Sequence, residues 1–236
     1  MLSSLVRAAV GLVQRFRTVV RRCPLPDGGS ATLRLRFLHL AAERERAVGD
    51  SLCRVLRAVH LARQDAADLI AGKASPAVAD LFNRWFGGQR RGVPSVLLPQ
   101  HLQAVLGVLM AVHRGLRAGP LIVEGIRNED AIAWSNGSVV LVGPRYWSEA
   151  PPQARADGIL FHELTHLFAG TTDAAAGLDG PVYIHEPGGP DLAYPSDPIE
   201  YRDSESGRAG LYPPPEDLVR LADAYECFLE DGYLRR

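Results

Sequence analysis

The strongest constraint on how this chain folds is a ten-residue segment, FHELTHLFAG, at residues 161–170. Its two histidines, His162 and His166, are four residues apart, so on a helix their imidazoles lie on the same side. Apolar residues surround them, and Gly170 follows at a position where helices commonly end. The pattern predicts a helix over about residues 153–169 that presents both histidines together.

Glu163 directly follows the first histidine, which completes the arrangement H-E-x-x-H. Two imidazoles at this spacing can hold one Zn²⁺, and the glutamate can take the proton from a water that the metal activates. The alternative is an ordinary helix with two solvated histidines, which the apolar flanking residues disfavour. The segment therefore predicts a zinc site with Glu163 as general base.

A catalytic zinc normally has three protein ligands and one open position. After His166, the turn expected at Gly170 can bring the carboxylate of Asp173 back to the metal. A second assignment keeps the two histidines and gives the third position to Glu226 or another acid. The spacing of the residues leaves both assignments open.

These residues resemble the aspzincin metallopeptidases, the family of deuterolysin and the peptidyl-Lys metalloendopeptidases. That family follows H-E-x-x-H with G-T-x-D-x-x-Y-G, and GTTDAAAG at residues 170–177 matches the G-T-x-D and the final glycine. Three other stretches are similar to the family: RWFG at 84–87, VVLVGPRYWSEAP at 139–151 and LADAYECF at 221–228. The resemblance implies a zincin-like fold, Zn²⁺ as cofactor, a protein or peptide substrate, and Asp173 as third ligand.

The chain departs from the family at Ala176, where relatives have a tyrosine that is thought to stabilise the oxyanion. The alternative function is therefore a zinc-binding relative with weak or no catalysis that acts as a protein-binding module. The residues that could replace the missing phenol lie in the following loop and are Tyr183, Tyr194 and Tyr201.

The resemblance also bears on specificity through Asp223 and Glu226, which are three residues apart near the C-terminus. On spacing alone, a solvated acidic face is the simpler interpretation. In lysine-specific aspzincins, however, the matching acids line the pocket for the residue after the cut bond. The resemblance thus implies that the chain cleaves before lysine. Lys73 is the only lysine in the chain, which would suit resistance to self-cleavage, and a GC-rich codon bias explains this scarcity equally well.

The whole pattern predicts an α+β fold, mostly helical, with a small antiparallel sheet. Asn136-Gly137 between two β-rich runs predicts a hairpin. A basic amphipathic helix and linker are expected over 1–30, and the zincin-like domain over 31–236. Within that domain we expect strand-like residues from 31, helices over about 40–71, 75–87, 99–119, 153–169 and 213–232, strands near 121–126 and 131–143, and loops over 144–152 and 177–215.

Composition limits the remaining possibilities. A formal net charge of −1 gives no electrostatic basis for nucleic-acid binding. Cys23, Cys53 and Cys227 form no C-x-x-C pair, so a thiolate zinc site is excluded, while one disulfide can form. The N-terminus shows no clear secretory signal and no membrane span, and its helix is expected to pack on its own domain rather than contact a membrane. The location stays unknown, with export by a non-classical or specialised route left open.

Overall fold

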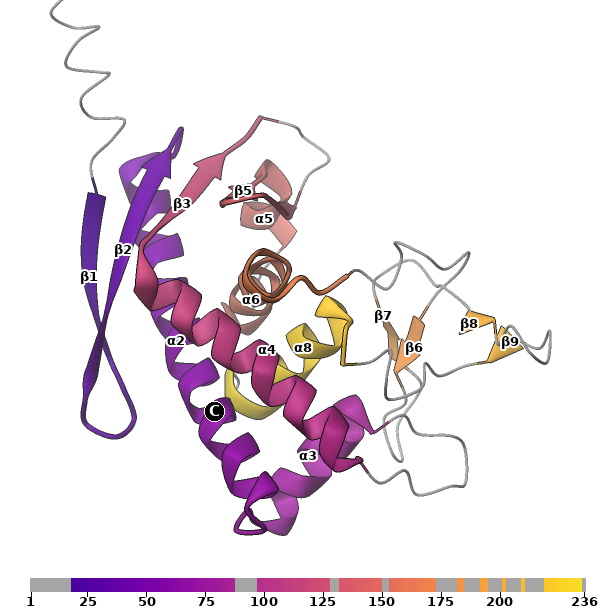
Figure 1. Ribbon diagram of the computed structural model, residues 1–236. Helices are drawn as coiled ribbons and strands as arrows, with labels where there is room; N and C mark the ends of the chain where they lie inside the picture. The colour runs from indigo at the N-terminus through magenta and orange to yellow at the C-terminus, as the bar shows by residue number, and fades with distance from the viewer. Residues whose placement is uncertain are drawn as a thin grey trace, which may run out of the picture.

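Figure 1 shows the computed structural model. The residues that it describes are 18–87, 97–127, 132–149, 153–172, 182–184, 192–194, 201–202, 209–210 and 219–234. Their elements follow in the order β1 (Thr18–Pro24), β2 (Ser30–Leu38), α2 (Ala42–Ile70), α3 (Pro76–Phe86), α4 (Pro99–Ala118), β3 (Pro120–Gly125), β4 (Ala133–Asn136), β5 (Val139–Val142), α5 (Pro144–Glu149), α6 (Gln153–Ala169), β6 (Val182–Ile184), β7 (Leu192–Tyr194), β8 (Tyr201–Arg202), β9 (Ala209–Gly210), α8 (Ala222–Leu229) and a π-helix, η2 (Glu230–Leu234).

The main sheet has five strands in the order β1-β2-β3-β5-β4. An antiparallel pair stands at each end, β1 with β2 and β4 with β5, while β2, β3 and β5 run parallel in the centre. Alternate residues of β2 are buried, as expected for a sheet with one covered face. The α+β class is confirmed, and the sheet is larger than predicted and mixed rather than antiparallel.

The helices lie on the covered side of this sheet (Figure 1). α2 contacts both α4 and α6, and α6 in turn contacts α4 and α8. An aromatic cluster joins α3 to α8, with ring centroids 5.1 Å apart for Phe86 and Phe228 and 4.8 Å apart for Phe86 and Tyr225. The helix that carries the two histidines is thus held between α2, α4 and α8.

The start of the described chain corrects one prediction. Within residues 1–30, where a basic amphipathic helix and a linker were expected, the chain is a strand from residue 18, because Cys23 packs into the core and residues 18–24 pair with β2. A disulfide between Cys23 and Cys53 ties β1 to α2 across a separation of 30 residues. By restricting the unfolded chain, it stabilises the folded state by about 3–4 kcal/mol. Residues on both sides of the expected boundary at residue 30 therefore share one sheet, and residues 1–17 lie outside the described structure.

Other boundaries are confirmed or moved by the structure. The Asn136-Gly137 hairpin is confirmed, with Gly137 at a φ of 62°. A short helix, α5, replaces the loop expected after residue 143. The last described helix, α8, begins at Ala222, and the part of the expected helix at 213–218 lies outside the described residues. Two short strand pairs, β6–β7 and β8–β9, lie in the region expected as a long loop. No helix in the described stretches is long and apolar enough to cross a membrane.

Candidate metal centre

α6 ends as the sequence predicts, at Gly170, which has a φ of 67° that favours glycine. The turn brings Thr171 back onto the helix, where its hydroxyl lies 2.7 Å from that of Thr165. Thr172 then joins the segment before α8, donating from its N–H to the carbonyl of Arg220. The residues just after the histidines are therefore fixed against both α6 and α8.

The two histidines of α6 face one another. Their Nε2 atoms are 3.0 Å apart and their rings are nearly perpendicular, at 82°. Both side chains are partly buried, and α4, α8 and the sheet surround the helix. The i, i+4 spacing therefore directs one nitrogen of each imidazole to a common point, as the sequence predicts.

The protonation of the other ring nitrogens, the Nδ1 atoms, determines whether the Nε2 atoms can bind a metal ion. His166 Nδ1 lies 2.7 Å from the carbonyl oxygen of Thr171, which can only accept, so this Nδ1 carries the proton. His162 Nδ1 lies 3.1 Å from a carboxylate oxygen of Glu226, an ion-pair contact whose negative charge favours a proton on Nδ1. Each Nε2 then has its lone pair directed at the other, an arrangement that a cation between them stabilises.

This arrangement fits a tetrahedral zinc site. Two nitrogens bound to one Zn²⁺ at about 2.0–2.1 Å stand about 3.3 Å apart, close to the 3.0 Å between these Nε2 atoms. Within the described stretches, no three His, Cys, Asp or Glu side chains gather closely enough to hold a metal ion. The described residues thus supply two ligands that fit zinc, and Asp173 lies outside them.

Glu163, the predicted base, is on α6 beside His162 and its side chain is buried, with 6% of the residue exposed. A buried carboxylate next to a metal site is where a general base is needed. The backbone of Tyr183, Tyr194 and Tyr201 is in β6, β7 and β8, but their side chains lie outside the described structure. The same holds for Asp223 in α8.

Glu226 comes from α8 and meets His162 on the side away from His166. Its contact is with Nδ1, whereas a third ligand would approach the point shared by the two Nε2 atoms. This geometry disfavours Glu226 as the third ligand. It places the carboxylate instead where it can orient His162, a role that the sequence analysis did not anticipate and that no local pattern signals.

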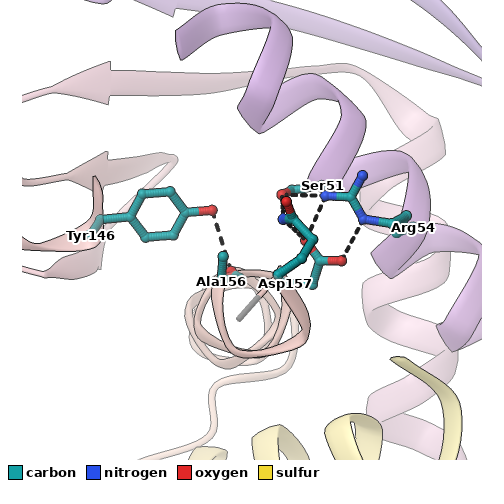
Figure 2. A network of polar contacts seen from close by, with 6 residues as sticks. Ser51, Arg54, Tyr146, Ala156 and Asp157 are labelled. Carbon is teal, nitrogen blue, oxygen red and sulfur yellow. Dashed lines mark hydrogen bonds and ion pairs between the residues drawn. The ribbon is translucent and has the colours of Figure 1, made fainter. Parts of the chain in front are cut away.

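A polar network fixes the start of α6 against α2 (Figure 2). Asp157, only 2% exposed, accepts two hydrogen bonds from Arg54, from Nε at 2.6 Å and from Nη2 at 3.0 Å. Gln153 and Ser51 complete the network, and the Tyr146 hydroxyl donates to the Ala156 carbonyl at 3.3 Å. A buried carboxylate satisfied by a guanidinium and an amide holds one orientation, so α6 is fixed at both ends.

Comparison with known proteins identifies no family for the chain. No protein-family model matches it, and no curated protein matches it. Among solved structures, a zinc peptidase from Grifola frondosa resembles it, with a TM-score of 0.48 and 15% sequence identity. The alignment covers 82% of this chain and 98% of the peptidase chain. At this distance, the function has to be argued from the chain's own residues.

Proposed function

We propose that the chain is a zinc-dependent endopeptidase in which His162, His166 and Asp173 hold the metal and Glu163 is the general base. The observation that carries the proposal is the pair of Nε2 atoms 3.0 Å apart, with each Nδ1 facing an oxygen acceptor. The match of residues 170–173 to the aspzincin G-T-x-D motif supports Asp173 as the third ligand.

Each proposed site residue has a separate role in peptide hydrolysis. Zinc, when bound, lowers the pKa of a water and polarises the peptide carbonyl. The Glu163 carboxylate accepts the proton of the attacking water and passes it to the leaving amine. Thr171 and Glu226 keep the two imidazoles in the tautomer that leaves Nε2 available. Tyr183, Tyr194 and Tyr201 are the candidates for the oxyanion donor in place of Ala176.

Metal content and turnover test the proposal. The purified protein should carry about one zinc per chain by elemental analysis, and His166→Ala should lose it. Glu163→Gln should retain the metal but lose most hydrolysis of a denatured protein, since an amide cannot accept the proton. A wild-type protein with no bound zinc and no thermal shift on adding zinc would contradict the metal site itself.

The preference for lysine is a finer proposal that rests on Asp223 and Glu226 of α8, the two acids that the resemblance implies line the substrate pocket. Two carboxylates near the site would attract an ammonium and disfavour acidic side chains. Mass spectrometry of a digested denatured protein should show cuts before lysine, and Asp223→Asn should spread them. Cuts at apolar residues in the wild type would reject the lysine preference while leaving the endopeptidase intact.

One observation favours the alternative, a zinc-binding module with little catalysis: Ala176 stands where the family has its tyrosine. Measuring zinc binding together with hydrolysis of a denatured substrate distinguishes the two proposals. Protein that binds one zinc but hydrolyses no denatured substrate, even at high enzyme concentration, would support the module. Hydrolysis that Glu163→Gln removes would support the enzyme.

A further inference from the structure

Two buried threonine hydroxyls, those of Thr165 and Thr171, lie beside the proposed metal centre and have no part in the proposed reaction. Thr165 is on α6 between the two histidines and is 0% exposed, while Thr171 follows the end of the helix and is 8% exposed. Their Oγ1 atoms are 2.7 Å apart. Because an unsatisfied buried hydroxyl is costly, each of them is expected to have a defined hydrogen-bond partner.

The partners of these hydroxyls determine where each proton points. Thr165 Oγ1 lies 2.7 Å from the carbonyl oxygen of His162, one turn earlier on the helix. A carbonyl oxygen can only accept, and a threonine hydroxyl has a single proton, so Thr165 donates to His162. In the contact between the two hydroxyls, Thr165 therefore accepts, and the proton comes from Thr171.

The direction of this hydrogen bond decides what the His166 ring meets. Its Nδ1 lies 2.7 Å from the Thr171 carbonyl oxygen and 3.3 Å from Thr171 Oγ1. Because the hydroxyl proton of Thr171 points to Thr165, the hydroxyl presents a lone pair to Nδ1 rather than its proton. Both oxygens of Thr171 then act as acceptors, so the proton of the neutral imidazole is stable on Nδ1 and the ring lone pair is on Nε2.

Without the acceptor at Thr165, the same hydroxyl can have the opposite effect on His166. Thr171 Oγ1 is within hydrogen-bond distance of Nδ1 and can donate its proton there, which requires a lone pair on Nδ1 and moves the ring proton to Nε2. An Nε2 that carries a proton cannot bind a metal ion. The pairing of the two threonines thus selects between a form of His166 that can bind zinc through Nε2 and one that cannot.

We propose that Thr165 is a positioning residue for the metal centre that acts through Thr171. By accepting the hydroxyl proton of Thr171, it keeps the proton of His166 on Nδ1 and the lone pair of Nε2 directed at the metal. The proposal deepens the proposed function and rests on it for the role of zinc, whereas the tautomer of His166 is also a property of the metal-free chain. Neither threonine is proposed to contact zinc or substrate.

The tautomer of His166 in the metal-free protein tests this proposal directly. Long-range proton–nitrogen NMR spectra, recorded well above the ordinary histidine pKa of about 6.5, distinguish a ring protonated on Nδ1 from one protonated on Nε2. His166→Gln assigns the signals, and we expect the wild type to be protonated on Nδ1. Thr165→Val keeps the size of the side chain without its hydroxyl and should shift a large part of the population to Nε2, whereas Thr165→Ser should match the wild type. Thr165→Ala should show the same shift and replaces the valine variant if that variant does not fold.

Removing the competing hydroxyl as well separates this effect from loosened packing. The double variant Thr165→Val/Thr171→Val has no hydroxyl that can donate to Nδ1, so His166 should return to the form protonated on Nδ1 although a buried contact is lost. Zinc affinity, measured by competition with a chelator, should follow the tautomer. We expect it to be about tenfold weaker for Thr165→Val, the lower end of the loss for partners of metal ligands, and largely recovered in the double variant. Thr172→Val is the matched control at an exposed neighbour and should change neither quantity.

Two results would overturn the proposal. One is a Thr165→Val protein that keeps the wild-type tautomer of His166. The other is a double variant that stays protonated on Nε2, which would assign the shift to damaged packing. A wild-type protein that binds no zinc but shows the expected tautomer shifts would instead contradict the proposed metal centre and support the role of Thr165 in fixing the tautomer.

Discussion

The Nδ1 atoms of His162 and His166 contact different kinds of group, and this difference can be tested by mutation. A backbone carbonyl holds Nδ1 of His166, whereas a side chain, Glu226, faces Nδ1 of His162. Partners of this kind orient a metal-binding imidazole and raise its basicity, and their loss typically costs 10–100-fold in metal affinity. Glu226 can be removed by changing a side chain, whereas the Thr171 carbonyl, the shorter contact of His166, cannot.

Glu226→Ala should therefore weaken zinc binding by about 10–100-fold, measured by competition with a coloured chelator. Glu226→Gln, which keeps an oxygen acceptor, should recover part of this loss. Asp223→Asn is the matched control on α8 and should leave zinc affinity unchanged. If Glu226→Ala alters only KM for lysine substrates while zinc affinity stays at the wild-type value, Glu226 belongs to the substrate pocket instead.

The sequence predicts those features of this site that depend on residues close together in the chain, and it does not predict contacts between distant segments. The spacing of His162 and His166, with Gly170 after them, is sufficient to predict the helix and the shared direction of the imidazoles. The acceptors of their Nδ1 atoms are not predictable in this way. A backbone carbonyl such as that of Thr171 has no side-chain signature, and Glu226 reaches the site only because α8 packs on α6.

At the scale of elements, the position of α6 depends on a close approach to α4. Gly115 faces the Phe168 ring, and a Cβ there would overlap it at the base of the ring rather than at a movable end. Phe168 is two residues after His166, so a shift of this contact would move the end of the helix that carries this proposed metal ligand.

Gly115→Ala should destabilise the protein by about 1–3 kcal/mol, because a packed ring and two helices must move to make room. Gly107→Ala in the same helix meets nothing within 4 Å. It should stabilise by about 0.5–1 kcal/mol, because alanine favours the helix. Urea unfolding monitored by circular dichroism measures both, and equal effects of the two substitutions would show that α4 and α6 are not closely packed at Gly115.

Elements were predictable where their periodic pattern was long, as for α2, α4 and α6. The short ones were missed for a physical reason. α5 has only six residues, Pro144–Glu149, too few for a helical period to show, and a proline pair follows at 151–152. β1 reads as an amphipathic basic segment, because the burial of Cys23 depends on its partners in β2 and α2. The parallel pairing of β2 with β3 joins segments separated by three helices, which no local pattern specifies.

At the scale of the whole molecule, α2, α4 and the β1–β2 hairpin meet around two buried histidines. The rings of His60 and His113 have centroids 5.6 Å apart, and His60 lies 3.4 Å from the Asp27 carboxylate at the hairpin turn. Burial, together with Arg63 and Arg117, lowers the pKa of His113 from 6.5 to about 4. The joint between the hairpin and the helices is therefore sensitive to acid.

The direction of this effect follows from proton binding. Between pH 6.5 and about 4, His113 binds a proton in the unfolded chain but not in the folded one, so the free energy of unfolding falls as pH falls and about 3 kcal/mol is lost. His113→Gln, which cannot titrate, should lose less stability than the wild type between pH 7 and pH 4.5 in urea unfolding. In the folded wild type, the NMR signals of the His113 ring should not titrate above pH 5. A midpoint near 6.5 for these signals, or parallel stability curves for the two proteins, would show that His113 is not the group that makes this joint sensitive to acid.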